Sequence, residues 1–266
     1  MKYVLLFFIL SSISCRHAPN EISKETGDSS TSVVEDTTDR ILFIVSNQDT
    51  YGTSTINAAN HFAEIVFAYD VFKKSGYAID FVSPEGGAIP IGYLNTSNAM
   101  EKQYLYDFEF MGLLKNTLRP EQVDPKKYKA VYYGGGGAAM FGVPENETIQ
   151  KITMSVYEEN KGIVSAICHG TAGIVNLKTK DGKFLYEGKK VNGFPDLFEN
   201  KEAAYYQEFP FSIEQTIQDR GGNFSYSEEG WDNYFVLDER LITGQDPTAA
   251  ASVAQNVVNT LKTQTK

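Results

Sequence analysis

The side chain best placed for covalent chemistry is a cysteine directly after a predicted buried strand. Residues 163–167 form an unbroken apolar run, and Cys168-His-Gly-Thr-Ala-Gly173 follows. We expect the strand to turn into a short helix here, with Gly170 and Gly173 allowing the close approach of a nucleophile elbow. Helix amides aimed at Cys168 predict a lowered thiol pKa. On this context alone a buried structural cysteine fits equally well.

The histidines limit which side chain can act as a base for Cys168. There are three: His17 near the N-terminus, His61 on the first predicted helix, and His169 beside the cysteine. A base for this thiol is therefore His169 or His61. No cluster of histidine and cysteine has the spacing of metal ligands, so we expect no metal site, and the chemistry needs no cofactor.

Four consecutive glycines, residues 134–137, follow a predicted strand at 128–133. They place exposed amides at the carboxyl edge of the sheet, where open α/β sheets bind ligands. A phosphate cradle is one interpretation, although the Gly-Lys-Ser/Thr ending and the dinucleotide fingerprint are both missing. An oxyanion-hole amide facing Cys168 suits an acidic protein better. A merely tight loop is the third interpretation.

Carboxylates are the remaining candidates. Glu64 lies near the edge of the apolar stripe of the first predicted helix, where most glutamates are simply solvated. Asp196, Glu199 and Glu202 form an acidic segment in which any one could orient an imidazole.

Alternating strand and helix patterns must position these side chains. Apolar periodicity predicts strands at 41–46, 77–81, 128–133, 163–167 and 189–194, a hairpin at 233–243, and helices at 62–72, 144–161, 210–219 and 247–261. Such alternation implies an α/β fold with a mostly parallel sheet covered on both faces. The less periodic residues 92–127 predict an inserted helical segment bordering the active site.

The N-terminus carries a different signal. Residues 1–14 predict a secretory signal peptide, with Lys2 ahead of an apolar run and small residues behind it. Cys15 then occupies the position of a lipidated cysteine, although Ser12 stands where leucine is usual and ordinary secretion is the alternative. Polar residues 15–39 predict a disordered tether, and 40–266 the folded domain. We therefore expect an extracytoplasmic lipoprotein, periplasmic or at the cell surface.

The net charge of the 266 residues is −10, and no cluster of lysine and arginine is present. Nucleic-acid binding is therefore not expected. The only membrane contact that the sequence predicts is the lipid anchor.

Taken together, these segments resemble the ThiJ/PfpI superfamily, and within it the heat-shock-protein-31-like glyoxalase III branch. The resemblance covers most of residues 40–262. It rests on segments whose order and spacing match: Glu64, Tyr69-Asp-Val-Phe-Lys-Lys-Ser-Gly76, Asp80-Phe-Val-Ser-Pro-Glu-Gly-Gly87, Ala130-Val-Tyr-Tyr-Gly-Gly-Gly-Gly137, Ala166-Ile-Cys-His-Gly170, Val191-Asn-Gly-Phe-Pro-Asp196 and Leu241-Ile-Thr-Gly-Gln-Asp-Pro247. It implies a flavodoxin-like sandwich.

The resemblance also implies roles for particular residues. Cys168 would be the nucleophile, His169 the acid/base and Glu199 the acidic third member, with Asp196 as second choice. Glu64 would contact the sulfur, its pKa raised by desolvation while that of Cys168 falls. Gly135 or Gly136, with the His169 amide, would form the oxyanion hole. The family pattern Pro-Gly-Gly-His-Gly reads Gly-Gly-Gly-Gly-Ala at 134–138, and Thr171 replaces a proline, which changes the pocket rim.

The activity implied is conversion of a small aldehyde, a 2-oxoaldehyde such as methylglyoxal, to D-lactate without glutathione or metal. Protein deglycation, cysteine peptidase activity and a non-enzymatic holdase or redox-stress role are the alternatives. An amidotransferase would need a histidine downstream of His169, and none follows. Relatives are often dimers, so a homodimer is expected.

Overall fold

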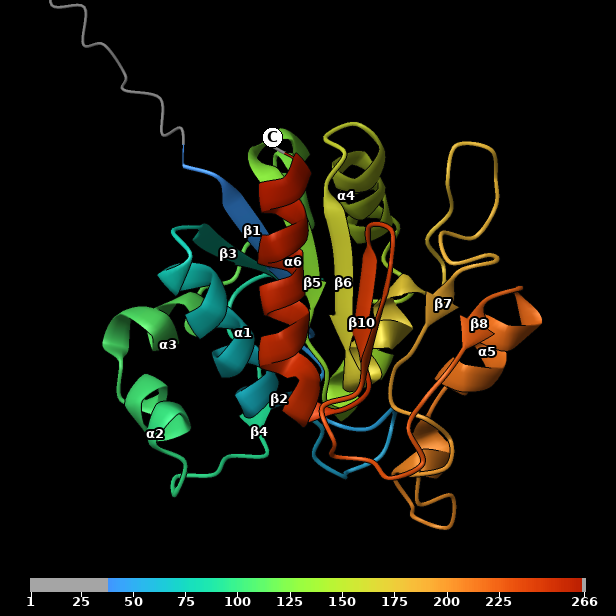
Figure 1. The fold of residues 1–266 in the computed structure, drawn as a ribbon. Helices are drawn as coiled ribbons and strands as arrows, with labels where there is room; N and C mark the ends of the chain where they lie inside the picture. Colours follow the sequence, from blue (N-terminus) through green and yellow to red (C-terminus); the bar gives the residue numbers. More distant parts are fainter. Residues whose placement is uncertain (1–37, 265–266) are drawn as a thin grey trace, which may run out of the picture. The chain divides into compact units, whose positions relative to one another are not determined.

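The computed structural model describes residues 38–264, which build an α/β sandwich around one central sheet (Figure 1). Six strands lie in the order β3-β1-β5-β6-β10-β9. Their bounds are β1 Arg40–Ile44, β3 Ala78–Val82, β5 Tyr128–Tyr133, β6 Ile163–Ile167, β9 Phe235–Asp238 and β10 Leu241–Gly244. All neighbours are parallel except β9, which returns antiparallel beside β10. The predicted fold class and the hairpin are confirmed.

Helices cover both faces of this sheet. Their bounds are α1 Phe62–Lys74, α2 Ala99–Leu105, α3 Phe108–Lys115, α4 Glu147–Glu158, α5 Ile213–Asp219 and α6 Ala250–Gln264. The helices α1 and α6 pack together on one face, with α2 and α3 beyond α1, whereas α4 and α5 cover the other face. The side chain of Asn146 caps α4 by accepting the Ile149 N–H at 3.0 Å. The helix therefore begins at residue 147, whereas the sequence predicted a start at residue 144.

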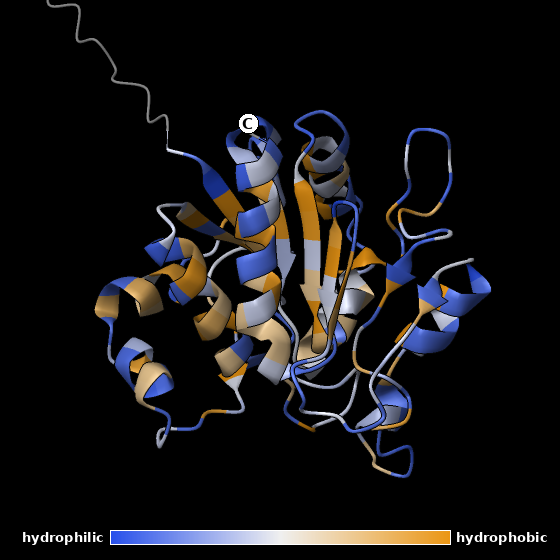
Figure 2. Cartoon of the chain, in the orientation of Figure 1, coloured by the Kyte–Doolittle hydropathy of each residue, from blue (hydrophilic) through white to orange (hydrophobic). Residues whose placement is uncertain are grey.

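Side chains of β1 alternate between two cores because successive residues of a strand point to opposite faces. Ile41 and Phe43 belong to the core under α1 and α6, and Leu42 and Ile44 to the core under α4. A strand buried on both faces needs the unbroken apolar run that the sequence shows. In Figure 2 the central strands are mostly hydrophobic, and α6 carries hydrophilic residues on its outward side.

Short elements complete the fold. Two small parallel pairs join β2 Asn60–His61 to β4 Ile91–Gly92 and β7 Lys190–Val191 to β8 Asn223–Phe224. The 3₁₀ helices are η1 Pro120–Gln122, η2 Pro125–Lys127, η3 Gly137–Met140, η4 Cys168–Ile174, η5 Tyr206–Glu208 and η6 Pro247–Ala249. The strand predicted at 189–194 is thus only two residues long.

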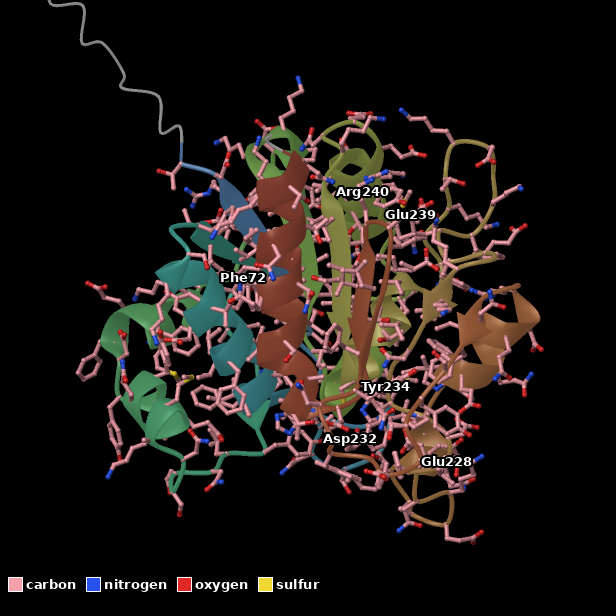
Figure 3. All side chains as sticks on the ribbon, in the orientation of Figure 1. Phe72, Glu228, Asp232, Tyr234, Glu239 and Arg240 are labelled. Carbon is pink, nitrogen blue, oxygen red and sulfur yellow. The ribbon has the colours of Figure 1, made fainter. Side chains whose placement is uncertain are left out.

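Strand order places the ligand-binding edge. β1 is flanked by β3 on one side and β5 on the other, so the chain runs first to one side of β1 and then back to its other side. This reversal places a crevice at the carboxyl ends of β1 and β5. In Figure 3, Glu239 and Arg240 in the β9–β10 turn lie at the opposite end of the sheet from Asp232 and Tyr234. The loops at the latter end build the site.

The predicted position of the insertion at 92–127, bordering the active site, holds only at its start. Residues 92–127 do form a helical insertion, but α2 and α3 pack on α1, where Tyr104 and Phe110 contact the ring of Tyr69. From this segment only Tyr93 reaches the pocket described below. The two helices of the insertion lie away from the pocket because their buried aromatic rings pack into the core beside α1.

The predicted signal peptide, the lipidation site at Cys15 and the tether lie outside the described residues, except for positions 38 and 39. Among residues 38–264, no helix combines the length and the apolar character needed to cross a bilayer.

Candidate active site

Cys168 is the first residue after β6 and has the strained backbone of a nucleophile elbow. Its φ is +55°, which a non-glycine residue rarely adopts. The turn is tight, because a Cβ on Gly170 would lie 2.4 Å from the Tyr133 carbonyl oxygen. The thiol is free and only 4% exposed. The predicted elbow is confirmed, although the helix that follows, η4, is a 3₁₀ helix.

A hydrogen-bonded chain joins Cys168 to His169 and Glu199. The Cys168 Sγ lies 3.4 Å from His169 Nδ1, and His169 Nε2 lies 2.7 Å from Glu199 Oε1. The imidazole packs against Phe194, with ring centroids 4.7 Å apart. This is the order nucleophile, base and orienting carboxylate that covalent catalysis requires.

The structure distinguishes Glu199 from the other carboxylates of its segment. Asp196 is engaged elsewhere, accepting hydrogen bonds from Ser212 Oγ at 2.7 Å and Lys201 Nζ at 3.0 Å. Glu202 is exposed. The second choice for the third member, Asp196, is therefore wrong, and Glu199 has the predicted place.

Glu64 is fully buried rather than solvated. Its Oε2 accepts the Gly135 N–H at 2.8 Å, and the carboxyl lies beside the Cys168 thiol. Burial raises the pKa of Glu64 to about 8, so the group is mainly protonated at neutral pH. Its Oε1 is buried and has no hydrogen-bond partner within residues 38–264.

The expected lowering of the Cys168 pKa is wrong. Burial raises this pKa, and a charge on Glu64 raises it further, whereas the His169 amide lowers it by donating to the sulfur. The expectation rested on helix amides and on contact with Glu64, and it left out the burial of the sulfur. A 3₁₀ turn also supplies fewer aligned dipoles than an α-helix. When Glu64 is protonated, its repulsion of the thiolate disappears.

The glycine loop divides its amides between two tasks. The Gly135 N–H is used by Glu64, so its predicted place in the oxyanion hole is wrong. The Gly136 amide has no hydrogen-bond partner in the described part of the chain, and this residue lines the pocket. Only glycine fits there, since φ is +93° and a Cβ would lie 2.4 Å from the Ala59 carbonyl oxygen. Gly136 is therefore the remaining loop candidate for the oxyanion hole.

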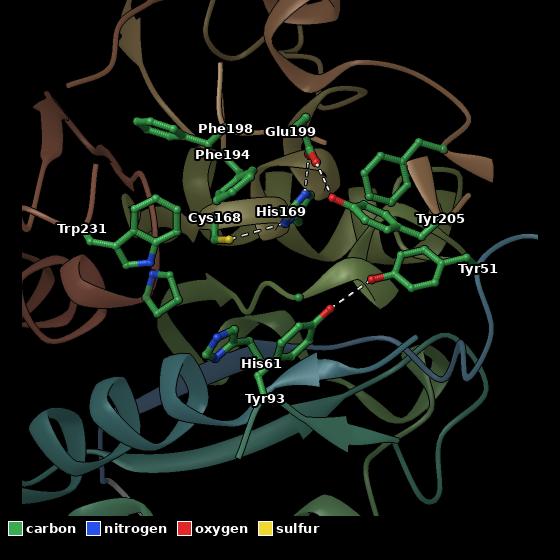
Figure 4. Close-up of a pocket in the computed structure, with 13 residues that line it drawn as sticks. Tyr51, His61, Tyr93, Cys168, His169, Phe194, Phe198, Glu199, Tyr205 and Trp231 are labelled. Atoms are coloured by element: carbon green, nitrogen blue, oxygen red, sulfur yellow. Dashed lines mark hydrogen bonds and ion pairs between the residues drawn. The ribbon is translucent and has the colours of Figure 1, made fainter. Parts of the chain in front are cut away.

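The site opens into a pocket of about 410 Å³ (Figure 4). Its walls are mainly aromatic and come from Tyr51, His61, Tyr93, Gly136, Cys168, His169, Phe194, Phe198, Glu199, Tyr205, Phe209, Trp231 and Pro247. None of these lining residues is a lysine or arginine, so the pocket suits an uncharged ligand.

Sequence reasoning missed the tyrosines of this pocket. The Tyr205 hydroxyl lies 3.5 Å from Glu199 Oε2, and the Tyr51 and Tyr93 hydroxyls lie 3.0 Å apart. A Cβ on Gly137 would lie 2.2 Å from the Tyr51 hydroxyl, so Tyr51 fills the space beside the position where the family pattern has histidine. That departure was the one available signal.

No group of three or more histidine, cysteine, aspartate or glutamate side chains within residues 38–264 could hold a metal ion. The arrangement supports covalent chemistry by a thiolate with a neighbouring base.

Comparisons with known proteins show what the chain is similar to. The model of the DJ-1/PfpI family matches residues 58–260. The chain is similar to Glyoxalase 3 of Candida albicans, with 30% identity over 82% of this chain and 96% of that protein. Its fold is similar to the crystal structure of glyoxalase III from Candida albicans, with a TM-score of 0.76 and 27% identity over 84% of this chain and 97% of the other. It is also similar to the Rapid Encystment Protein 24 KDa of Francisella tularensis, with a TM-score of 0.78 and 28% identity over 84% and 99% of the two chains.

Proposed function

Because this chain belongs to the DJ-1/PfpI family, and because its cysteine, histidine and glutamate form one hydrogen-bonded chain, we propose that it is a glutathione-independent glyoxalase. Its substrate is a small 2-oxoaldehyde such as methylglyoxal, and its product is the 2-hydroxy acid, here lactate. The observation that carries the proposal is the Cys168–His169–Glu199 chain beside the protonated carboxyl of Glu64.

Addition of the sulfur is the first step. The His169 amide donates to Sγ, which favours the thiolate, and the proton on Glu64 removes the negative charge that would oppose it. Sγ attacks the aldehyde carbon C1, and the π pair of that carbonyl moves onto its oxygen. The amide of Gly136 stabilises this oxyanion, which then takes up a proton to give a hemithioacetal.

Proton transfer by His169 is the second step. The imidazole removes the C1 proton, the bonding pair forms a C1=C2 double bond, and the C2 carbonyl pair moves onto its oxygen. Return of the proton to C2 and re-formation of the C1 carbonyl give a thioester. Water then breaks the S–C1 bond, releasing the acid and the thiol. C1 is oxidised and C2 is reduced within one molecule, so no external redox partner is required.

The test is lactate formation from methylglyoxal without glutathione, by wild type and by Cys168→Ala. We expect turnover in the wild type and none in the variant. A wild type that consumes no methylglyoxal, while its Cys168 remains reduced, would contradict the proposal and favour a non-enzymatic role.

We also propose that the enzyme is an extracytoplasmic lipoprotein anchored through Cys15. The support is the apolar run at residues 3–10 followed by small residues and a cysteine. Metabolic labelling with an azide-tagged fatty acid in a bacterial host tests this proposal. Wild type should be labelled in the membrane fraction, and Cys15→Ala should not be. Equal labelling of the two, or none of either, would contradict the anchor.

A further inference from the structure

His61 lies on the opposite wall of the pocket from Cys168 and His169 (Figure 4). It ends β2, and its backbone N–H donates to the Gly135 carbonyl at 2.9 Å. The glycine loop lies close to this wall at Gly136, where a Cβ would lie 2.5 Å from the backbone nitrogen of His61. The mechanism above does not use this imidazole.

The surroundings of the ring identify the nitrogen that faces the substrate. Nδ1 is fully buried and has no hydrogen-bond partner among residues 38–264. Nε2 is not among the buried unpartnered atoms of this part of the chain and makes no hydrogen bond there, so it is the nitrogen accessible from the pocket. Because a buried N–H without an acceptor is rarer and less favourable than a buried acceptor without a donor, the proton belongs on Nε2.

The imidazole is also held neutral. Burial, with a smaller contribution from His169, lowers the pKa of His61 to about 4. At neutral pH the ring therefore presents one N–H donor and no charge, which is the form that polarises a carbonyl without competing for a proton.

Neighbouring aromatic side chains fix the orientation of the ring. Tyr93 stacks on His61 with parallel planes and centroids 4.7 Å apart, and its hydroxyl is tied to Tyr51. Tyr93 itself has a φ of +57°, an unfavourable backbone conformation for a tyrosine. This strained residue lies beside the imidazole in Figure 4 and holds the ring in place by stacking on it.

We propose that His61 is a further catalytic residue, whose Nε2–H donates a hydrogen bond to the C2 oxygen of the 2-oxoaldehyde. This inference rests on the proposed glyoxalase function and adds a recognition group for the second carbonyl. When the C1–H pair becomes the C1=C2 bond, the C2 carbonyl pair moves onto the oxygen that faces His61. The hydrogen bond strengthens as this charge develops, so it favours the transition state over bound substrate. Aldehydes without an adjacent carbonyl gain nothing from it.

The test compares two variants of similar side-chain length, His61→Gln with an N–H donor and His61→Met without one. The kcat and KM for methylglyoxal, the rate of Cys168 alkylation by iodoacetamide and the melting temperature are measured for each. We expect Met to lower kcat about 100-fold with little change in KM, and Gln to stay within about tenfold of the wild type. Alkylation rates should be equal in all three proteins.

The outcomes separate this inference from the proposed function. Equal kcat values for Gln and Met, whether high or low, would overturn the role of His61 as a donor while wild-type turnover upheld the glyoxalase. Absence of turnover in the wild type would overturn both proposals. A fall in alkylation rate that matched the fall in kcat would show that His61 only supports Cys168, and would also overturn the inference.

Discussion

Glu64 and Cys168 are buried together behind the glycine loop, and burial raises the pKa of both groups. Two such neighbours cannot both lose their protons easily, so they titrate as a coupled pair. Of the two states that hold a single proton, only the one that keeps it on Glu64 leaves a thiolate on Cys168. The residue scale is where sequence patterning was least informative, since Glu64 on its helix looked like a surface charge.

The pH dependence of the free energy of unfolding should reveal whether the buried Glu64 carboxyl is protonated in the folded protein. Its pKa is about 8 in the folded protein, above the usual 4.5 that applies to the unfolded chain, so its stabilising contribution is complete below about pH 4.5 and is lost as pH rises through 8. Glu64→Gln removes this dependence. Relative to the wild type, the variant should gain a few kcal/mol of unfolding free energy between pH 5 and pH 8. Urea denaturation at both pH values measures the gain, and parallel curves would show that Glu64 is ionised in the fold.

Glu199 and Asp196 offer a matched comparison for the histidine partner. Glu199→Gln keeps the side-chain length but removes the charge that orients His169, so kcat should fall about 100- to 1000-fold. Asp196→Asn should leave kcat within about threefold, because Asp196 contacts Ser212 and Lys201 instead. Steady-state kinetics with methylglyoxal measure both kcat values. A larger loss of kcat in Asp196→Asn than in Glu199→Gln would mean that Asp196, and not Glu199, orients His169.

At the element scale, the order of strands and helices could be predicted because each buried strand needs an unbroken apolar run and each helix an apolar stripe. The loops could not. Tyr51 and Tyr93 reach the pocket from the connections before α1 and after β4, which have no period to read. The insertion at 92–127 was misplaced for a related reason: its helicity was visible, but the face it would cover was not.

The glycine loop gives an element-scale prediction. Gly136→Ala should destabilise the protein by more than Gly182→Ala, although both residues have a positive φ. Left-handed strain costs each variant about 1–3 kcal/mol, and only Gly136 also meets a backbone, with the Ala59 carbonyl oxygen 2.4 Å from the added Cβ. No atom lies within 4 Å of a Cβ on Gly182. Urea midpoints measure both, and equal losses would show that the loop can move away.

For the whole molecule, the sequence resemblance predicted the fold, the nucleophile, its base and Glu199. It did not predict which substrate the pocket selects, because that choice depends on aromatic side chains from segments far apart in the sequence. Tyr51, Phe209 and Trp231 are examples. The homodimer stays a prediction, and sedimentation equilibrium of the purified protein would test it.

The most direct measurement is proton NMR of methylglyoxal incubated in D₂O with the purified protein and no glutathione. Proton removal by His169, followed by exchange of the imidazole proton with D₂O before its delivery to C2, predicts lactate that carries deuterium at C2, formed by the wild type and not by Cys168→Ala. Methylglyoxal that remains unchanged, or equal lactate from the wild type and the alanine variant, would contradict a glyoxalase whose nucleophile is Cys168.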